Sequence, residues 1–255
     1  LVVIGFLVLP ELVRDSLVNQ ATIALIYAIA ALSLVILTGW GGVVSLGQVA
    51  IVGVGGVLAA NLLADRNTDM FLILGACAVG GGVVALVLGL PALRVSGQFL
   101  AVTTLAFAVT ADNYFFNPTN NPSWFPSNYP RPELWGYFDL TDEQTLYYFT
   151  LAILGVAALV VANLRRARTG RTIAAARDNE KAVAAVGVNT VEARLSGFVF
   201  AGMFAGVAGA IHAVTLRGVG AQTYPTATSL LLFSMVIIGG AASISGTLAG
   251  VLIVY

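Results

Sequence analysis

Charged residues are scarce in this chain, and their scarcity excludes a water-soluble protein. Asp, Glu, Lys and Arg make up 9% of the 255 residues, whereas hydrophobic residues make up 58%. A soluble protein of this size needs a much larger charged surface. The formal net charge is zero, so nothing indicates a nucleic-acid partner. We therefore predict an all-α, polytopic membrane protein in which residues 1–255 form one transmembrane domain.

Cysteine and histidine are each present only once. Cys77 lies within an apolar run, so an intrachain disulfide is impossible and metal chemistry is disfavoured. With His212 as the one histidine, a multi-histidine metal site or active site is excluded. We interpret His212 as a packed or interfacial residue near the outer end of its helix, with a functional role as the alternative. We predict no catalytic residues, metal site or cofactor.

Long apolar runs predict the membrane crossings. A bilayer core about 30 Å thick needs roughly 20 apolar residues in a helix. Runs of suitable length occupy residues 16–38, 43–64, 70–90, 147–164 and 195–216. Partial or short runs occupy residues 1–9, 98–111, 227–240 and 243–255. We predict about nine crossings in the ordered part of a longer protein. Residues 1–9 lack the basic flank and cleavage site of a signal peptide.

The basic residues predict the orientation, because seven of the 12 lie within residues 165–194. Loops rich in Lys and Arg stay in the cytoplasm. Residues 112–146 then lie outside. They are rich in aromatic residues and contain five prolines within residues 118–132, which prevent regular helix. This external segment is either a plain loop anchored at lipid headgroups or a gate or docking surface for an external partner.

Glycine and polar residues interrupt the apolar runs at residues 37–48, 89–98 and 239–246. In the first interruption, Leu-Thr-Gly-Trp-Gly-Gly-Val-Val-Ser-Leu-Gly-Gln, the turn at residues 39–42 is too short to reach far into water. Irregular backbone is tolerated at membrane depth only against protein or a water-filled cavity. Broken helices of this type line substrate paths, because a helix amino terminus offers N–H groups to a carboxylate.

The polar residues in and after these interruptions are therefore candidates for a substrate pathway. Ser45 and Gln48 are expected to open the next helix, and a short apolar run carries two threonines. The predicted pathway residues are Gly39, Gly41, Gly42, Ser45, Gln48, Thr103 and Thr104. For the Ser and Thr residues, the alternative is hydrogen bonding to the preceding helical turn. The other glycines within apolar runs are expected mostly to let helices pack closely.

No clear apolar run carries a charge in its middle, which disfavours a proton-coupled carrier or a voltage sensor. The basic stretch, residues 165–194, instead predicts two brief helices at the membrane surface. Asp178 is expected to cap the second, with Glu180 in its first turn and Gly187 at its end. The first spans residues 170–177. The small residues between are free to enter a groove in a partner, or else the segment is amphipathic and held by membrane lipid.

Four motifs resemble those of the LivM-type permeases of branched-chain amino acid ABC transporters. Residues 170–189, GRTIAAARDNEKAVAAVGVN, are similar to the family's cytoplasmic loop, GRALRAIRDNERAAEALGIN. Residues 37–48 are similar to LTGWGGQVSLGQ, and residues 89–107 to GLPALRLRGLYLAVTTLAF. Residues 235–246 resemble MVVIGGLGSLWG. The motifs occur in the same order and extend across most of the chain.

The resemblance implies the permease subunit of an ATP-driven importer for branched-chain or related amino acids, working by alternating access. It implies two ABC ATPase subunits, a second permease subunit of a different, LivH-type chain, an external substrate-binding protein and a place in the inner membrane. The implied ATPase-coupling residues are Arg177, Asp178, Asn179, Glu180 and Gly187. ATP hydrolysis would belong to the partners, since the chain has no Gly-x-x-x-x-Gly-Lys-Ser/Thr loop.

One region departs from the family pattern and leaves the cargo open. Residues 117–132 keep Pro-Arg-Pro but lack the glycines of the family's Thr-Gly-Gly…Asn-Gly, on the side where substrate is delivered. Urea or short-chain amides are the alternative cargo within the same class. A stand-alone secondary carrier or channel is the alternative from another class. A membrane enzyme is disfavoured, because no paired carboxylates or nucleophile–base pair is found.

Overall fold

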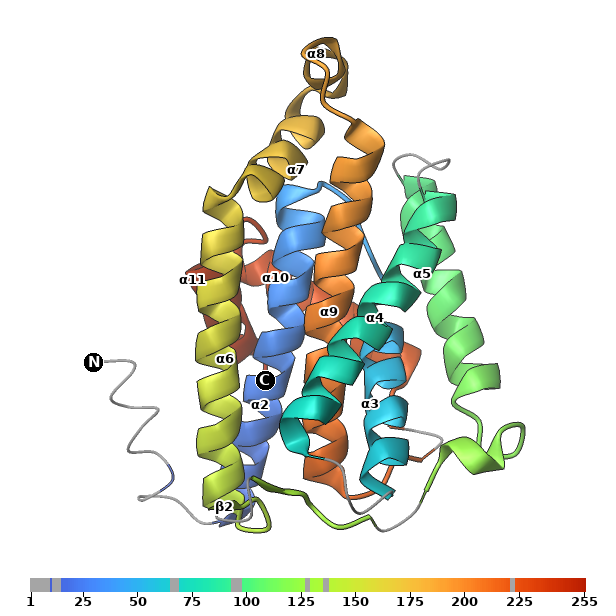
Figure 1. Ribbon diagram of the computed structural model, residues 1–255, viewed down its shortest axis with the longest axis vertical. Helices are drawn as coiled ribbons and strands as arrows, with labels where there is room; N and C mark the ends of the chain where they lie inside the picture. Colours follow the sequence, from blue (N-terminus) through green and yellow to red (C-terminus); the bar gives the residue numbers. More distant parts are fainter. Residues whose placement is uncertain are drawn as a thin grey trace.

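The computed structural model describes residue 10 and residues 15–64, 69–92, 98–126, 129–134, 138–220 and 223–255, and these form an elongated helical bundle (Figure 1). Its α-helices are α2 (Asp15–Leu34), α3 (Gln48–Ala64), α4 (Met70–Ala92), α5 (Gln98–Thr110), α6 (Glu143–Arg166), α7 (Arg168–Asp178), α8 (Glu180–Ala185), α9 (Thr190–Leu216), α10 (Thr226–Gly239) and α11 (Ile244–Val254). The shorter elements are π-helical η1 (Val35–Trp40) and η2 (Ala111–Phe115), the 3-10 helix η3 (Pro122–Trp124) and the hairpin strands β1 (Glu133–Leu134) and β2 (Phe138–Asp139).

The predicted all-α class is confirmed, but nine crossings are more than the described residues show. Helices long and apolar enough to cross a membrane are Ser16–Trp40, Met70–Pro91, Glu143–Arg166 and Thr190–Leu216. Shorter apolar helices are Gln48–Ala64, Phe99–Phe115, Thr226–Gly239 and Ile244–Val254. At about 1.5 Å per residue, these do not reach across a core about 30 Å thick. The crossing predicted at residues 1–9 lies outside the described residues.

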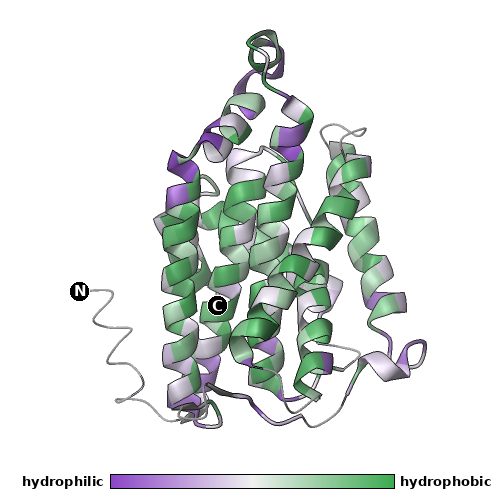
Figure 2. Cartoon of the chain, in the orientation of Figure 1, coloured by the Kyte–Doolittle hydropathy of each residue, from purple (hydrophilic) through white to green (hydrophobic). Residues whose placement is uncertain are grey.

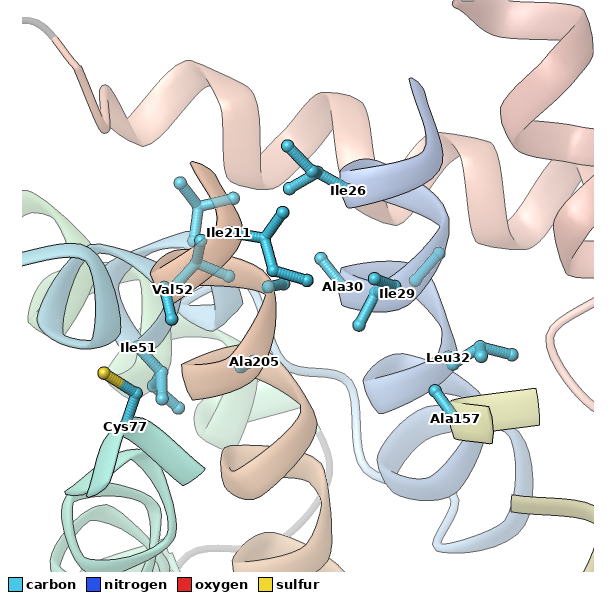
Figure 3. Close-up of a cluster of buried hydrophobic side chains, with 14 of the residues drawn as sticks. Ile26, Ile29, Ala30, Leu32, Ile51, Val52, Cys77, Ala157, Ala205 and Ile211 are labelled. Atoms are coloured by element: carbon cyan, nitrogen blue, oxygen red, sulfur yellow. The ribbon is translucent and has the colours of Figure 1, made fainter. Parts of the chain in front are cut away.

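Glycines pack α9 against α3 and α4 at the centre of the bundle. A Cβ added to Gly206 would lie 2.0 Å from the carbonyl oxygen of Cys77 on α4. One added to Gly209 would lie 1.9 Å from the carbonyl oxygen of Val52 on α3. Figure 3 shows the apolar side chains that fill the space around α9, including Ile211. These contacts confirm the packing role expected of the glycines, since small residues let backbones approach in a membrane.

Polar residues gather at the two ends of the bundle, and apolar residues form the band between them (Figure 2). The basic segment, residues 165–194, lies at one end with α7 and α8, and the β1–β2 hairpin of the external segment lies at the other (Figure 1). Large apolar side chains such as Val79 and Leu159 are exposed on the outer faces of α4 and α6. This distribution suits a protein surrounded by lipid at mid-height.

The basic segment forms two brief helices, as predicted, but its cap is not Asp178. Asp178 is the last residue of α7, whereas Asn179 has the extended backbone that an N-cap requires, with φ −154 and ψ 92. Its side chain accepts a hydrogen bond from the amide of Ala182 at 3.0 Å. Gly187 follows α8 with φ +81, which fits the predicted helix end.

Candidate functional site

The interruption predicted at residues 37–48 is a deep break between α2 and α3. α2 continues into η1, and Gly42 then turns the chain with φ +67, a conformation that favours glycine. The chain next runs back along the bundle to Gln48, the first residue of α3 (Figure 1). Gln48 is 1% exposed. α3 therefore begins inside the protein, as expected of a broken membrane helix.

Gln48 joins α2, α3 and α9 at the break. Its Nε2 donates to Ser33 Oγ on α2 at 2.7 Å and to the carbonyl of Ala201 on α9 at 3.3 Å. Its Oε1 is buried and has no hydrogen-bond partner within the described part of the chain. Gln48 also lines a cavity of about 10 Å³ with Ser45 and Thr104. A space of that size holds about one water molecule, which suits an unpaired amide oxygen.

Side chains from other helices already engage amide groups at this break. The amide of Leu46 donates to Thr104 Oγ1 on α5 at 3.0 Å. The amide of Val49, in the first turn of α3, donates to Ser229 Oγ on α10 at 3.2 Å. The break is therefore closed in this conformation, and a carboxylate would have to displace these hydroxyls to reach the amides.

The two predicted threonines face different surroundings. Thr104 is 7% exposed and turns toward the break, with Ser45 and Gln48. Thr103 is exposed and its hydroxyl donates to the carbonyl of Phe99 at 2.9 Å, one helical turn back. The structure thus brings Ser45, Gln48 and Thr104 together and leaves Thr103 outside this group. Both threonines back-bond to the preceding turn, since the Thr104 hydroxyl also donates to the carbonyl of Ala101, at 3.0 Å.

The three predicted glycines of the break allow close backbone contact. A Cβ on Gly39 would lie 1.9 Å from the carbonyl oxygen of Ala241, in the turn between α10 and α11. A Cβ on Gly41 would lie 2.6 Å from the carbonyl oxygen of Leu37. A Cβ on Gly42 would lie 2.8 Å from Cγ of a side chain of the basic segment. The break is therefore a junction between the α10–α11 turn and the basic segment.

The side chain that faces Gly42 belongs to Arg177, near the end of α7. Its guanidinium Nη1 donates to the carbonyl of Gly39. On α6, the guanidinium of Arg165 lies 5.2 Å from the centre of the Trp40 ring, within cation–π range. Two residues of the basic segment thus contact η1. Sequence patterns did not predict this contact, because Arg177 and Gly39 are 138 residues apart.

The other predicted coupling residues lie at the outer tip of the basic segment. Asp178, Asn179, Glu180 and Gly187 are all exposed on or beside α8. Glu180 Oε2 pairs with the guanidinium of Arg194 at 2.7 Å, which ties α8 to the first turns of α9. This tip therefore presents polar groups to the surroundings while its base is held to the transmembrane bundle.

At the opposite end of the bundle, the external segment is fastened to the carboxyl end of α9. Arg131 donates to the carbonyls of Val214 and Thr215, each at 3.2 Å, and pairs with Glu143 at 2.8 Å. Tyr129 Oη donates to the carbonyl of Ala213 at 3.0 Å. Burial raises the pKa of the Tyr129 phenol, which keeps it protonated as a donor. We call Tyr129, Arg131 and Glu143 the external clamp.

An apolar groove of about 500 Å³ lies beside the external segment. It is lined by residues of α3, α4, α5 and η2 and by Trp124. Among the described residues of its wall, Asn61 carries the one side-chain amide, and its Nδ2 already donates to the carbonyls of Val57 and Trp124. The groove therefore offers apolar contact and no charged partner for an ammonium or a carboxylate group.

Comparison with known sequences identifies the kind of protein that carries this break and this basic segment. The family profile described as the permease component of the branched-chain amino acid transport system matches residues 16–255. The chain belongs to this permease family. The match includes η1, the break, α7 and α8, so the resemblance of the four motifs to LivM-type permeases is confirmed.

Two relatives of this permease family member are high-affinity branched-chain amino acid transport system permease proteins, LivM. The protein of Salmonella typhimurium strain LT2 is 27% identical over 271 residues, which cover 96% of this chain and 64% of the relative. The protein of Escherichia coli K12 is 27% identical over 259 residues, which cover 92% and 61%. The chain thus spans less than two thirds of either relative. No solved structure matches it.

In this permease family member, Ser229 at the break and Asp112 beside the start of α10 were not among the predicted site residues. Ser229 of α10 accepts from Val49, and Asp112 of η2 accepts from both the amide and the hydroxyl of Thr226, at 2.9 and 3.0 Å. Asp112 therefore caps α10 from another element. A serine in an apolar run was a signal for Ser229, but its partner is 180 residues away.

Proposed function

We propose that the chain is the transmembrane permease subunit of an ATP-driven importer for branched-chain or related amino acids. The observation that carries the proposal is the family match across the break and the basic segment. Two ABC ATPase subunits would bind at the end of the bundle with α7 and α8, on the cytoplasmic side of the inner membrane. An external binding protein would deliver cargo at the other end, and a second, LivH-type permease would complete the pathway.

Exposed groups at the tip of the basic segment support ATPase docking there. Val186, just after α8, is 78% exposed and can contribute apolar contact to a partner. The alanines of α8 beside it are largely exposed too. Asp178 and Glu180 provide polar contacts at the rim of this small apolar surface. Such a helix is suited to enter a groove in a partner protein.

The break supports alternating access in the same proposal. α3 begins inside the bundle, and residues 46–49 at its start make one side-chain hydrogen bond each to α2, α5, α9 and α10. Breaking a few such bonds opens a path past Ser45, Gln48 and Thr104. Discontinuous helices are a common device for substrate sites at membrane mid-depth.

The proposal is tested by reconstitution in vesicles with the ATPase, the binding protein and the second permease subunit. We expect ATP-dependent uptake of leucine, isoleucine or valine, and ATP hydrolysis stimulated by the same cargo. A panel of other amino acids, short-chain amides and urea identifies the cargo. Stimulation of ATP hydrolysis by urea or amides alone would show that these, and not amino acids, are the cargo. Uptake without any ATPase would favour a stand-alone carrier.

Variants at the tip separate docking from folding. Glu180→Lys is expected to uncouple hydrolysis from uptake, and the swapped pair Glu180→Lys with Arg194→Glu rebuilds the internal ion pair without restoring the docking charge. Gly187→Trp adds bulk into open space, since nothing lies within 4 Å of an added Cβ. Gly187→Asn tolerates the same positive φ and serves as its control. Unchanged uptake in Glu180→Lys and Gly187→Trp would contradict the coupling role.

A further inference from the structure

We infer that Arg177 is the internal link through which movement of the basic segment reaches the helix break, and that it does not contact the ATPase. The inference rests on the proposed function. The resemblance implies one coupling role for all five residues, whereas we assign Arg177 a role different from the other four. Asp178, Asn179 and Glu180 follow Arg177 directly and are exposed at the tip. Arg177 is exposed as well, but its guanidinium turns toward the bundle and donates to the carbonyl of Gly39.

α7 is seated on α9 by the same face that carries Arg177. Ile173 and Ala176 are 2% and 3% exposed, and Ile173 packs over Gly197 of α9. Ile173 and Arg177 are four residues apart, so they lie on one face of the helix. The Arg177 side chain therefore extends from α7 beside its apolar contact with α9. A tilt or shift of α7 moves the guanidinium directly.

The partner of Arg177 is well suited to a guanidinium. Gly39 lies in the last turn of η1, where the carbonyls at a helix carboxyl end carry partial negative charge. The stem of Arg177 lies over Gly42, where a Cβ would meet its Cγ at 2.8 Å and its Cδ at 3.1 Å. The side chain of Arg177 therefore occupies the space that Gly42 leaves open.

Gly39 also connects this contact to the rest of the break. Its carbonyl accepts from Arg177, and its Cα packs on the carbonyl of Ala241 in the α10–α11 turn. From Gly39 the chain continues through the break to Gln48 and α3. A displacement of Gly39 thus acts on α3 along the chain and on α10 and α11 through contact. π-Helical turns such as η1 are often found at functional sites.

The first test uses the complete importer with Arg177→Ala, Arg177→Lys and a matched control, Arg171→Ala. Arg171 lies on the same helix and also donates to a carbonyl, that of Arg166, but within the basic segment. In Arg177→Ala we expect the ATPase to co-purify at the wild-type ratio, while cargo taken up per ATP hydrolysed falls by about tenfold. Arg177→Lys, which keeps one donor, is expected to recover part of the loss.

Two results would overturn the inference. Loss of the ATPase from the Arg177→Ala complex would make Arg177 a docking residue. An unchanged uptake per ATP would show that the contact with Gly39 transmits nothing. Failure of the wild-type complex to take up amino acids with ATP would count against the proposed function instead, and the second test does not depend on that function.

The second test measures the link in the purified protein without ATPase. Spin labels at exposed positions, Lys181→Cys and Ala242→Cys, report the distance between α8 and the α10–α11 turn in a Cys77→Ser background. We expect Arg177→Ala, but not Arg171→Ala, to broaden the distance distribution. Equal widths in the two variants would show that Arg177 does not hold the basic segment to the break.

Discussion

Arg131 and Arg177 each donate to a carbonyl at the carboxyl end of a helix, at opposite ends of the bundle. The Arg131 side chain is 2% exposed and reaches four carbonyls besides the carboxylate of Glu143. Arg177 is exposed and reaches the single carbonyl of Gly39. One arginine is fixed by many bonds in a buried site, whereas the other can leave and return at little cost.

The difference indicates which parts of the permease stay together and which can move. α9 runs from the external clamp to the basic segment and packs through glycine on α3 and α4. These contacts are close and backbone to backbone, so they form a rigid frame. α8 is tied to α9 by the exposed Glu180–Arg194 pair, and α7 is tied to η1 by the single hydrogen bond of Arg177. The predictions below test this contrast in order of decreasing effect.

Arg131→Ala is expected to be the most damaging change at the external clamp. It removes a buried ion pair and leaves several carbonyls without a donor, which costs about 3–5 kcal/mol of the free energy of unfolding. Thermal unfolding in detergent measures the loss. Arg131→Lys keeps the charge but not the planar guanidinium, so its unfolding temperature should lie between those of the wild type and Arg131→Ala. A loss in Arg131→Ala no larger than in Arg177→Ala would break the contrast between the two ends.

Gly209→Ala is expected to loosen the frame. Its Cβ would meet the carbonyl oxygen of Val52 at 1.9 Å, and overpacking of this kind costs about 1–3 kcal/mol. Gly155→Ala in α6 is the control, since nothing lies within 4 Å of an added Cβ there. That control should stabilise the helix by roughly 0.5–1 kcal/mol. Equal unfolding temperatures in the two variants would contradict the close packing of α9.

Asp112→Ala removes the side chain that caps α10 from η2. Loss of a helix cap costs about 1 kcal/mol, and Asn is as good a cap as Asp. We therefore expect faster amide hydrogen exchange in the first turn of α10 for Asp112→Ala, and little change for Asp112→Asn. Faster exchange along α2 as well would show that the effect is not local to α10.

Arg194→Ala is expected to have the smallest effect on stability. Its ion pair with Glu180 is partly exposed, with 36% and 48% of the two side chains accessible. Such pairs contribute at most about 1 kcal/mol and weaken as salt is added. Chemical unfolding at low and high salt measures the change. A loss comparable to that of Arg131→Ala would remove the distinction between a fixed external end and a loosely held basic end.

Local patterns predicted those features that depend on neighbouring residues. The glycines at residues 39–42 predicted the break, and Gly187 predicted the end of α8. Asp178 was wrong as the cap because α7 extends through it and leaves the extended position to Asn179. Hydropathy overestimated the crossings, because it does not distinguish a helix that spans the bilayer from one that begins inside the protein.

Contacts between residues far apart in the sequence could not be predicted, for a physical reason. The partners of Gly39 are Arg177 and Ala241, and the partner of Val49 is Ser229, all supplied by helices distant along the chain. A single sequence shows periodicity within an element but not which distant side chain meets it. Thr103 and Thr104 illustrate this, since adjacent threonines of equal propensity face opposite surroundings.

The hydroxyl that caps α3 has a consequence for biosynthesis. Ser229 follows Val49 by 180 residues, so the ribosome has made α3 through α9 before this cap exists. Until α10 has entered the bilayer, the newly inserted α3 has an open amide at its buried end. α10 therefore completes a joint that α3 began, and a nascent polypeptide arrested before α10 carries that joint unfinished.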